Sequence, residues 1–352
     1  MLSELPFEMI DKVFGYLEEK DKLNLAQVNQ QFESAFAHHA REAYKKLQCA
    51  KYTDYQLKTI LTTCGPTVSC LISNNYNLNY ATCKLIAKHC VNLQYFTQVI
   101  SDLNFDACKY VLAIKGLKNI TLSFNISWDY EESDLLQYIN ADCKALSVQA
   151  ISDYQAQKLR QLINLEELHV APKYYIRNIF KIVSKIKKLR ALHLYNYKEC
   201  FTSPNQYVEY TELEELELYT CKIYTTLPKC PKLKVLRLMV RSFIDYRDIE
   251  RYADTLEHLQ LCYYGNLHHD LFASILIIVL RECRRLQCLE ASSHTIYHVF
   301  HQNLNSFIDT LRTNGFSNER RFVLKGCVMA RLRNDFPDSA VWDLIRCEDV
   351  EM

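Results

Sequence analysis

Leucines recur along this chain in a short pattern that repeats at nearly constant intervals. The units LEELHV, LRALHL, LEELEL, LKVLRL and LEHLQL begin at Leu165, Leu189, Leu213, Leu233 and Leu256, and each reads L-x-x-L-x-L. Successive units start 20–24 residues apart. Alternate residues of an extended strand point to the same side, and one unit cannot bury its own leucines. The pattern therefore predicts a stacked array of short parallel strands.

Weaker copies extend this array in both directions. They are LKNITL at Leu117, LQYFTQ at Leu93, LQCLEA at Leu286, VSCLIS near Val68 and CKALSV near Cys143. The sequence does not fix how CKALSV aligns with the repeat unit. The stretches YIRNIFKIVSKIKK and LFASILIIVL lie between units and are predicted to be helical. The second, Leu271–Leu280, is about half the length of a membrane span and indicates a buried helix. Longer intervals around Leu286 predict insertions, or a carboxy-terminal cap near RRFVLKGC.

The first 48 residues follow a different, helical pattern. One apolar face is formed by Met9, Ile10, Val13, Phe14 and Leu17, whose spacing fits a helix. Pro6 suits the first helical position. The sequence predicts a second helix capped by Asp21, with Leu23, Leu25 and Val28, and a third capped by Asn29 that runs through Phe32 and Phe36 toward Leu47. Three helices of this size are near the lower limit for independent folding, and they carry more apolar side chains than they can bury among themselves. This favours coverage by a partner protein over a simple capping bundle.

Composition narrows the classes of function. Among 352 residues, 42 Lys and Arg balance 41 Asp and Glu, and a formal net charge of +1 gives no sign of nucleic-acid or membrane-surface binding. The opening residues contain no continuous apolar stretch typical of a secretion signal, so we expect a cytoplasmic or nuclear protein. The 15 cysteines are then expected to be reduced, and none is spaced C-x-x-C. We expect no cofactor and no metal site.

Catalytic motifs are also missing from the sequence. There is no G-x-S-x-G or H-E-x-x-H motif, and six glycines leave little material for a phosphate-binding loop. The cluster His268-His269-Asp270 is interpreted as part of a loop, because adjacent side chains diverge. We therefore expect no enzyme. A hydrolase that uses a cysteine and a histidine remains a third hypothesis, and it would require a thiol of depressed pKa.

The amino-terminal pattern resembles the F-box family. The resemblance rests on Leu5-Pro6, Glu8, Ile10, Val13-Phe14, Tyr16-Leu17, Asp21, Leu23, Leu25, Val28 and Phe32. Phe32 stands where the family often has tryptophan, and Asn29 where a small residue or cysteine is common. The resemblance implies binding to a Skp-type adaptor and, through it, to a cullin–RING ubiquitin ligase. The implied adaptor contacts are Leu5, Pro6, Met9, Ile10, Val13, Phe14, Leu17, Leu23, Leu25 and Val28.

The repeats resemble leucine-rich repeats, including the cysteine-containing type found in F-box leucine-rich proteins. Cys90, Cys230 and Cys283 each precede a unit's first leucine by three residues, and we interpret them as packing residues. The expected fold is α/β: a three-helix F-box (1–48), a curved leucine-rich-repeat solenoid (49–335) with strands on its concave face and helices on its convex face, and a carboxy-terminal tail (336–352).

Residues between the leucines of each unit are expected on the concave face. They are Thr121, Glu167, His169, His193, Tyr195, Glu215, Glu217, Tyr219, Arg237, Met239, His258 and Gln260. This mixture of tyrosine, arginine, histidine and carboxylate suits a protein or peptide ligand, although each position is also compatible with a solvated strand residue. The predicted substrate contacts are His169, His193, Tyr195, Glu217, Tyr219, Arg237 and Gln260.

Together the two patterns predict a substrate-recognition subunit of an SCF-type ubiquitin ligase. Such a receptor would act by holding a protein substrate near the ligase, at an effective concentration of order millimolar, and would supply no catalytic residue. The alternative hypothesis is a non-ligase interaction scaffold with an F-box-like cap. Adaptor binding by the amino-terminal face discriminates between the two.

Overall fold

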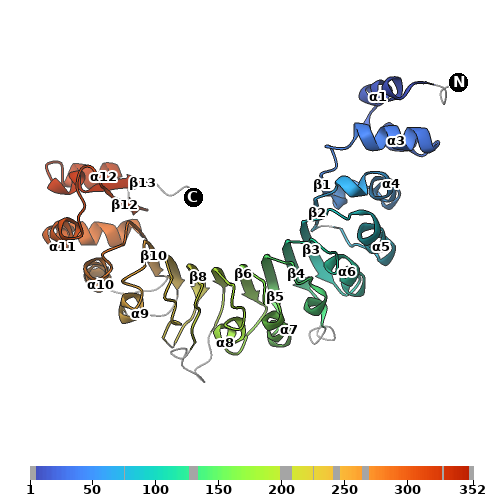
Figure 1. Cartoon of the computed structure of the whole chain (residues 1–352). Helices are drawn as coiled ribbons and strands as arrows, with labels where there is room; N and C mark the ends of the chain where they lie inside the picture. Colours follow the sequence, from blue (N-terminus) through green and yellow to red (C-terminus); the bar gives the residue numbers. More distant parts are fainter. Residues whose placement is uncertain are drawn as a thin grey trace. The chain divides into compact units, whose positions relative to one another are not determined.

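The structure is a computed structural model that describes residues 5–74, 76–126, 134–198, 208–224, 226–240, 246–263, 269–326 and 329–348. The chain divides into two compact units, Met1–Leu165 and Glu166–Met352. Each unit has its own strands, helices and apolar core (Figure 1). Among the described residues, no helix is both long and apolar enough to cross a membrane.

The first unit opens with the three predicted helices, α1 (Phe7–Tyr16), α2 (Glu19–Ala26) and α3 (Gln30–His39). Their shared core includes Phe14 and Phe36, whose ring centroids lie 5.6 Å apart. The predicted cap on α3 is confirmed, because the Asn29 side chain accepts hydrogen bonds from the backbone N–H groups of residues 31 and 32. These bonds satisfy two donors that the start of a helix leaves free.

Two sequence predictions about these helices are wrong. Asp21 does not cap α2, because the helix already begins after Glu18 and Asp21 lies inside its first turn. There a carboxylate still interacts favourably with the helix dipole. The third helix ends at His39 rather than continuing toward Leu47, which lies in the first strand of the repeats.

The rest of the first unit alternates strands with helices. Its strands are β1 (Lys46–Gln48), β2 (Cys70–Ser73), β3 (Tyr95–Ser101), β4 (Asn119–Asn125) and β5 (Ala145–Ile151). Its helices are α4 (Asp54–Cys64), α5 (Tyr80–His89), α6 (Phe105–Leu112) and α7 (Asp153–Lys158), with short 3-10 turns η2 (Cys49–Lys51), η3 (Gly65–Thr67), η5 (Leu135–Tyr138) and η6 (Leu159–Gln161). Neighbouring strands are parallel and in register. In Figure 1 the α-helices lie on one side of these strands.

The structure explains why the copy LQYFTQ is weak. Gln98 of β3 occupies the position of a repeat leucine and is buried, where it is paired in register with Ser73 of β2. The Ser73 hydroxyl donates to the Gln98 side-chain oxygen, and the Gln98 amide donates to the carbonyl of Val99 at 2.6 Å. A buried polar pair of this kind is tolerated because its groups are hydrogen-bonded.

The second unit continues the same alternation. Its strands are β6 (Glu167–Pro172), β7 (Ala191–Tyr195), β8 (Glu215–Cys221), β9 (Val235–Val240), β10 (His258–Tyr263), β11 (Cys288–Ala291), β12 (Phe322–Lys325) and β13 (Ile345–Glu348). Its helices are α8 (Ile179–Val183), α9 (Tyr246–Glu250), α10 (His269–Glu282), α11 (Ser293–Thr313) and α12 (Met329–Asp335), with the 3-10 turn η8 (Ala340–Asp343). The strands pair in parallel, and the repeat leucines fall opposite one another and are buried.

Several boundaries differ from the sequence predictions. The stretch YIRNIFKIVSKIKK is helical only over Ile179–Val183, because Asn178 adopts a left-handed conformation (φ 51°) that starts the helix late. RRFVLKGC contributes a further repeat strand, β12, and the long helix α11 is the insertion after β11. The segment 336–352, assigned by sequence to a tail, contains β13, which pairs in parallel with β12.

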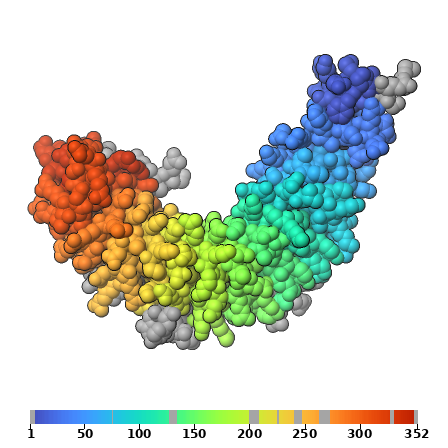
Figure 2. Space-filling model, in the orientation of Figure 1, coloured from blue at the N-terminus to red at the C-terminus, as the bar shows by residue number. Residues whose placement is uncertain are grey.

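In the space-filling view of Figure 2, atoms of successive repeats lie directly against one another within each unit. The predicted buried helix is confirmed: most residues of Leu271–Leu280 that the structure describes are buried in α10. The packing role of Cys90, Cys230 and Cys283 is also confirmed, since each is at most 1% exposed. The repeat leucines and these thiols form the cores that hold the strands in register.

Candidate functional site

An apolar groove lies on the amino-terminal helices. It has a volume of about 390 Å³ and is lined by Leu5, Ile10, Val13, Leu17, Asp21, Asn24, Leu25, Val28 and Phe32. Ile10 and Phe32 are buried, whereas Val28 is 64% exposed and the exposed polar residues Asp21 and Asn24 complete the lining. A concave apolar surface with a few polar groups is typical of a protein-docking site.

Hydrogen bonds hold the groove in place. The Gln31 side chain of α3 donates to the Leu5 carbonyl at 2.9 Å, which ties the entering chain to the helices. His39 Nδ1 lies 3.0 Å from the Asp11 carboxylate, and Lys22 Nζ lies 3.2 Å from His39 Nε2. These contacts join α1, α2 and α3 with polar groups outside the groove, so the groove itself stays apolar.

The predicted adaptor residues occupy three kinds of position. Six line the groove: Leu5, Ile10, Val13, Leu17, Leu25 and Val28. Pro6 and Met9 are exposed beside the start of α1. Phe14 and Leu23 are buried among the helices themselves, and Ile10 is buried too, because α1 and α2 each turn one part of their apolar surface toward α3. Sequence reasoning missed Asn24 as a lining residue, and only the fold shows it.

A second candidate site lies on the second unit's strands, on the sheet face that carries the residues between the repeat leucines. Two rows run across the strands in register. The first is Glu167, Ala191, Glu215, Val235 and His258. The second is His169, His193, Glu217, Arg237 and Gln260. Farther along the strands, Tyr195 pairs with Tyr219, and Tyr219 with Met239.

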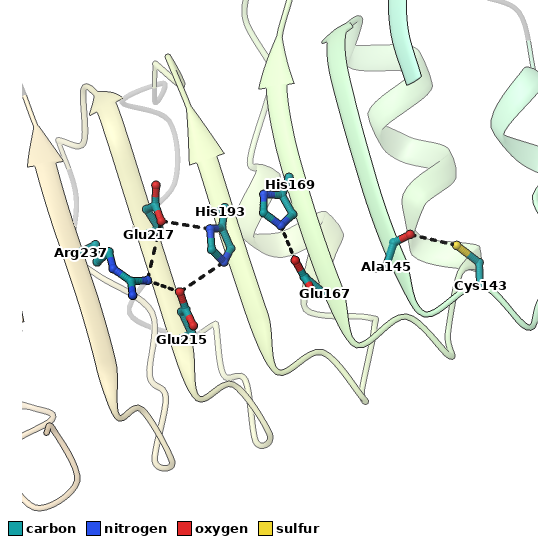
Figure 3. A network of polar contacts seen from close by, with 8 residues as sticks. All are labelled: Cys143, Ala145, Glu167, His169, His193, Glu215, Glu217 and Arg237. Atoms are coloured by element: carbon teal, nitrogen blue, oxygen red, sulfur yellow. Dashed lines mark hydrogen bonds and ion pairs between the residues drawn. The ribbon is translucent and has the colours of Figure 1, made fainter. Parts of the chain in front are cut away.

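Four residues of these rows, His193, Glu215, Glu217 and Arg237, form a polar network, and His169 pairs with Glu167 beside it (Figure 3). His193 Nδ1 lies 3.1 Å from a Glu217 carboxylate oxygen, and His193 Nε2 lies 3.6 Å from Glu215. The Arg237 guanidinium pairs with Glu215 and lies 3.8 Å from Glu217. Glu215 and Glu217 of β8 are therefore both near His193 of β7 and Arg237 of β9.

Aromatic rings extend the network. The rings of His169 and His193 stack with centroids 4.2 Å apart, and His169 Nε2 lies 2.6 Å from Glu167. Tyr195 and Tyr219 form a tilted pair at 5.9 Å, and Tyr219 is 36% exposed. The site thus combines carboxylates with accessible π faces.

Electrostatics favour the ionised form of Glu217 in this site. The hydrogen bond with His193, assisted by the charges of His193 and Arg237, holds the pKa of the Glu217 carboxyl below its usual value. Burial, together with the charge of Glu217, raises the pKa of the neighbouring Tyr195 phenol. Glu217 is therefore a carboxylate, and Tyr195 a neutral phenol, throughout the physiological range.

The structure brings six of the seven predicted substrate residues together. Gln260 is bonded instead to Glu290 of β11 at 2.5 Å. Sequence reasoning placed Glu167 and Glu215 on this face but left both out of the predicted contacts. The register of the repeats was the signal that could have found them, since each lies between two repeat leucines.

Among the described residues, one group has the arrangement that a metal ion would need: His193, Glu215 and Glu217, whose ligand atoms lie within 4.8 Å of one another. Arg237 already pairs with both carboxylates, so a metal ion would compete with this internal cation. The expectation of no metal site remains a prediction. His268 lies outside the described residues, as do the side chains of His269 and Asp270.

Comparison with known proteins identifies the first site. Residues 2–41 match the family model described as F-box domain. No curated protein sequence matches the chain. Similar solved structures include a TLR13–ssRNA13 complex (14% identity, TM-score 0.47, covering 80% of this chain and 42% of that one) and an internalin, InlF, from Listeria monocytogenes (15% identity, TM-score 0.40, covering 80% and 91%). The chain thus spans less than half the length of the TLR13 chain.

The match and the repeats together define the class of protein. The chain has an F-box domain followed by leucine-rich repeats, and its leucine-bearing strands are parallel with helices between them.

Proposed function

We propose that this protein is a substrate receptor of an SCF-type cullin–RING ubiquitin ligase. The F-box groove would bind a Skp-type adaptor, and the open strand face of the repeats would bind a protein substrate. The observation that carries the proposal is the apolar groove inside the F-box match, with Val13, Leu17, Leu25 and Val28 exposed or half-buried in the absence of a partner.

The energetics of the groove support a stable complex. Covering an apolar side chain contributes up to about 1.5–3 kcal/mol, so several half-covered side chains together offset the cost of association. Ile10, Phe14 and Leu23 would support the groove from beneath rather than contact the adaptor directly, since they are buried already.

The proposed receptor acts by proximity and not by chemistry. Binding a substrate beside the ligase makes ubiquitin transfer effectively intramolecular, at concentrations of order millimolar. Burial raises the pKa of the Cys49, Cys90 and Cys221 thiols to about 12. These thiols are therefore poor candidates for a nucleophile.

Co-purification of the full chain with a Skp-type adaptor tests the proposal. We expect the wild type to form a complex and Val28→Glu to bind about tenfold more weakly or worse, because a carboxylate would be placed in the apolar groove. The exposed position of Val28 should leave the fold intact, which circular dichroism checks.

The matched control is Leu103→Glu, which introduces the same charge at an 81% exposed leucine outside the F-box match. This variant should bind the adaptor like the wild type. Failure of the wild type to bind any Skp-type adaptor would instead leave the non-ligase scaffold as the better reading of the fold.

A further inference from the structure

The open strand face of the second unit carries an unequal set of charges. We use the name carboxylate–tyrosine face for Glu167, His169, His193, Tyr195, Glu215, Glu217, Tyr219 and Arg237, all on β6–β9. In the same formal count that gives the whole chain +1, which leaves histidine out, this face has three carboxylates and one guanidinium. The face therefore has an excess of negative charge on a protein whose total charge is nearly balanced.

A contact within the chain shows that this face can hold a guanidinium group. The Arg237 guanidinium lies against Glu215 and Glu217, and both carboxylates come from the neighbouring strand. A planar guanidinium matches paired carboxylates because its donors point in a fixed fork. The third carboxylate, Glu167, pairs with His169, and half of its side chain is exposed.

Tyrosine rings lie beside these carboxylates. Tyr195 and Tyr219 come from the strands that carry His193 and Glu217, and they are paired in register. An aromatic face next to carboxylates attracts a cation both through the ring quadrupole and through direct charge. A cationic side chain could therefore contact a carboxylate with its tip while its stem covers a ring.

We propose that the carboxylate–tyrosine face binds an arginine-rich segment of a protein partner. This inference rests on the proposed function in one respect: the segment would belong to the substrate. The complementary charge selects such a segment over an acidic one, which the carboxylates would repel. A metal ion on His193, Glu215 and Glu217 is the competing occupant, and chelator separates the two.

The direct test is fluorescence polarisation of the full chain with a labelled peptide of alternating arginine and glycine, in buffer containing EDTA. The matched probe replaces each arginine by citrulline, which keeps the shape of the side chain without its charge. We expect the citrulline peptide to bind about tenfold more weakly, and we expect arginine-peptide binding to weaken with salt. Equal binding of both peptides, or binding that EDTA abolishes, would overturn the proposal.

Substitutions locate the binding surface. Glu215→Gln with Glu217→Gln should weaken arginine-peptide binding about fivefold or more, because two carboxylates are lost. The charge-matched control is Glu282→Gln with Glu319→Gln, at exposed positions outside the face, and it should bind like the wild type. If the control loses as much as the test variant, the peptide responds only to total charge and the proposal fails.

The most discriminating variant is Arg237→Gln. Removing the internal guanidinium frees Glu215 and Glu217, so arginine-peptide binding should become about threefold tighter or more, whereas a purely structural arginine would give weaker binding. Arg237→Lys keeps the charge and should remain near the wild type, and circular dichroism checks that both variants fold. Unchanged or weaker binding by a folded Arg237→Gln would overturn the proposal.

Val28→Glu keeps this test separate from the proposed function. It changes the F-box groove, which lies in the first unit, and should leave arginine-peptide binding unchanged. A chain that binds adaptor but no arginine peptide would refute only the present inference. A chain that binds arginine peptide but no adaptor would refute only the ligase role.

Discussion

At the scale of single residues, cysteine serves in this chain mainly as a core residue. All thirteen cysteines in the described part of the chain are free, and most are buried. A buried thiol can still use its weak S–H donor. Cys221 Sγ, for example, donates to the Leu194 carbonyl at 3.2 Å. Burial raises the pKa of Cys143, Cys230 and Cys283 to about 12, so these thiols stay protonated.

This burial predicts low thiol reactivity. With a disulfide reagent at pH 8, the native chain should react slowly, because only the thiolate attacks and burial disfavours it. Among the thirteen cysteines that the structure describes, the half-buried Cys70, Cys262 and Cys347 should react first, and the ten buried ones only after denaturant is added. Colorimetric counting of released thiolate checks this. A single thiol that reacts within seconds in the native chain would support the thiol-hydrolase hypothesis.

The Glu217 carboxyl predicts a pH dependence. Its pKa is lowered in the folded chain by the His193 hydrogen bond, so its contribution to stability is present above the unfolded pKa. That contribution is lost as pH falls through the lower folded value. We expect Glu217→Gln to reduce the melting temperature at pH 7 and the difference to shrink below about pH 4. Solvent screening limits the effect to about 1 kcal/mol.

Differential scanning calorimetry of both proteins across this pH range is the measurement. Glu319→Gln, at an exposed site, serves as the control and should melt like the wild type at every pH. A constant difference between Glu217→Gln and the wild type down to pH 3 would show that the carboxylate is not stabilised by its partners.

At the scale of elements, the repeat strands end in a recurrent backbone turn. Ala150, Asn196 and Thr220 each have positive φ, between 52° and 57°, and each follows the last buried residue of its unit by two positions. At Thr220 the β8–β9 register shifts between Tyr219 and Cys221, as a β-bulge does. The bulge adds one residue to β8, and pairing resumes between Cys221 and Val240. Its conformation is one that L-residues rarely adopt, which is why it does not follow from the leucine pattern.

Substitution of two glycines with positive φ tests how closely neighbouring elements approach each other. Gly326, at the end of β12 (φ 82°), has no room for a Cβ, which would overlap the carbonyl oxygen of Ala291 in β11. Gly116 (φ 85°) has no atom near its Cβ position. We expect Gly116→Ala to cost about 1 kcal/mol from backbone strain alone, and Gly326→Ala to cost clearly more because the strands must also separate. Urea unfolding of each variant measures both costs.

Equal losses for the two glycine variants would contradict the close approach of β11 and β12. The comparison is matched, because both substitutions add one methyl group at similar φ. The difference between them therefore reports the packing of neighbouring elements.

At the scale of the whole molecule, each unit's stability rests on neighbouring repeats. In a repeat protein each turn contacts only the turns beside it, so a local defect affects its neighbours first. The F-box groove belongs to the first unit and the carboxylate–tyrosine face to the second, so the two proposed binding events use separate cores.

Leu216→Ala tests this separation. Leu216 is fully buried in β8, and its truncation should cost about 2–5 kcal/mol. Hydrogen exchange should rise in β7, β8 and β9 while the helices α1–α3 keep their protection and adaptor binding is retained. Increased exchange in α1–α3 would show that the two units unfold together.

The leucine spacing was enough to predict the class of fold, since a repeated L-x-x-L-x-L can be buried only by stacking. The F-box helices also followed from sequence, because apolar spacing and the Asn29 cap are local properties. Helix ends were less accurate. The start of α8 depended on the left-handed Asn178 and the end of α3 on packing, and neither has a clear local signal.

What the sequence by itself determined is therefore the identity of the elements and which of their residues are buried, because local periodicity controls both. Only the tertiary structure decided which exposed residues act together. It placed Glu215 between His193 and Arg237. It also showed that Val28 lines the groove whereas Phe14 is part of the core. The physical reason is that these contacts join different strands or helices, and their distances depend on register and packing across the whole unit.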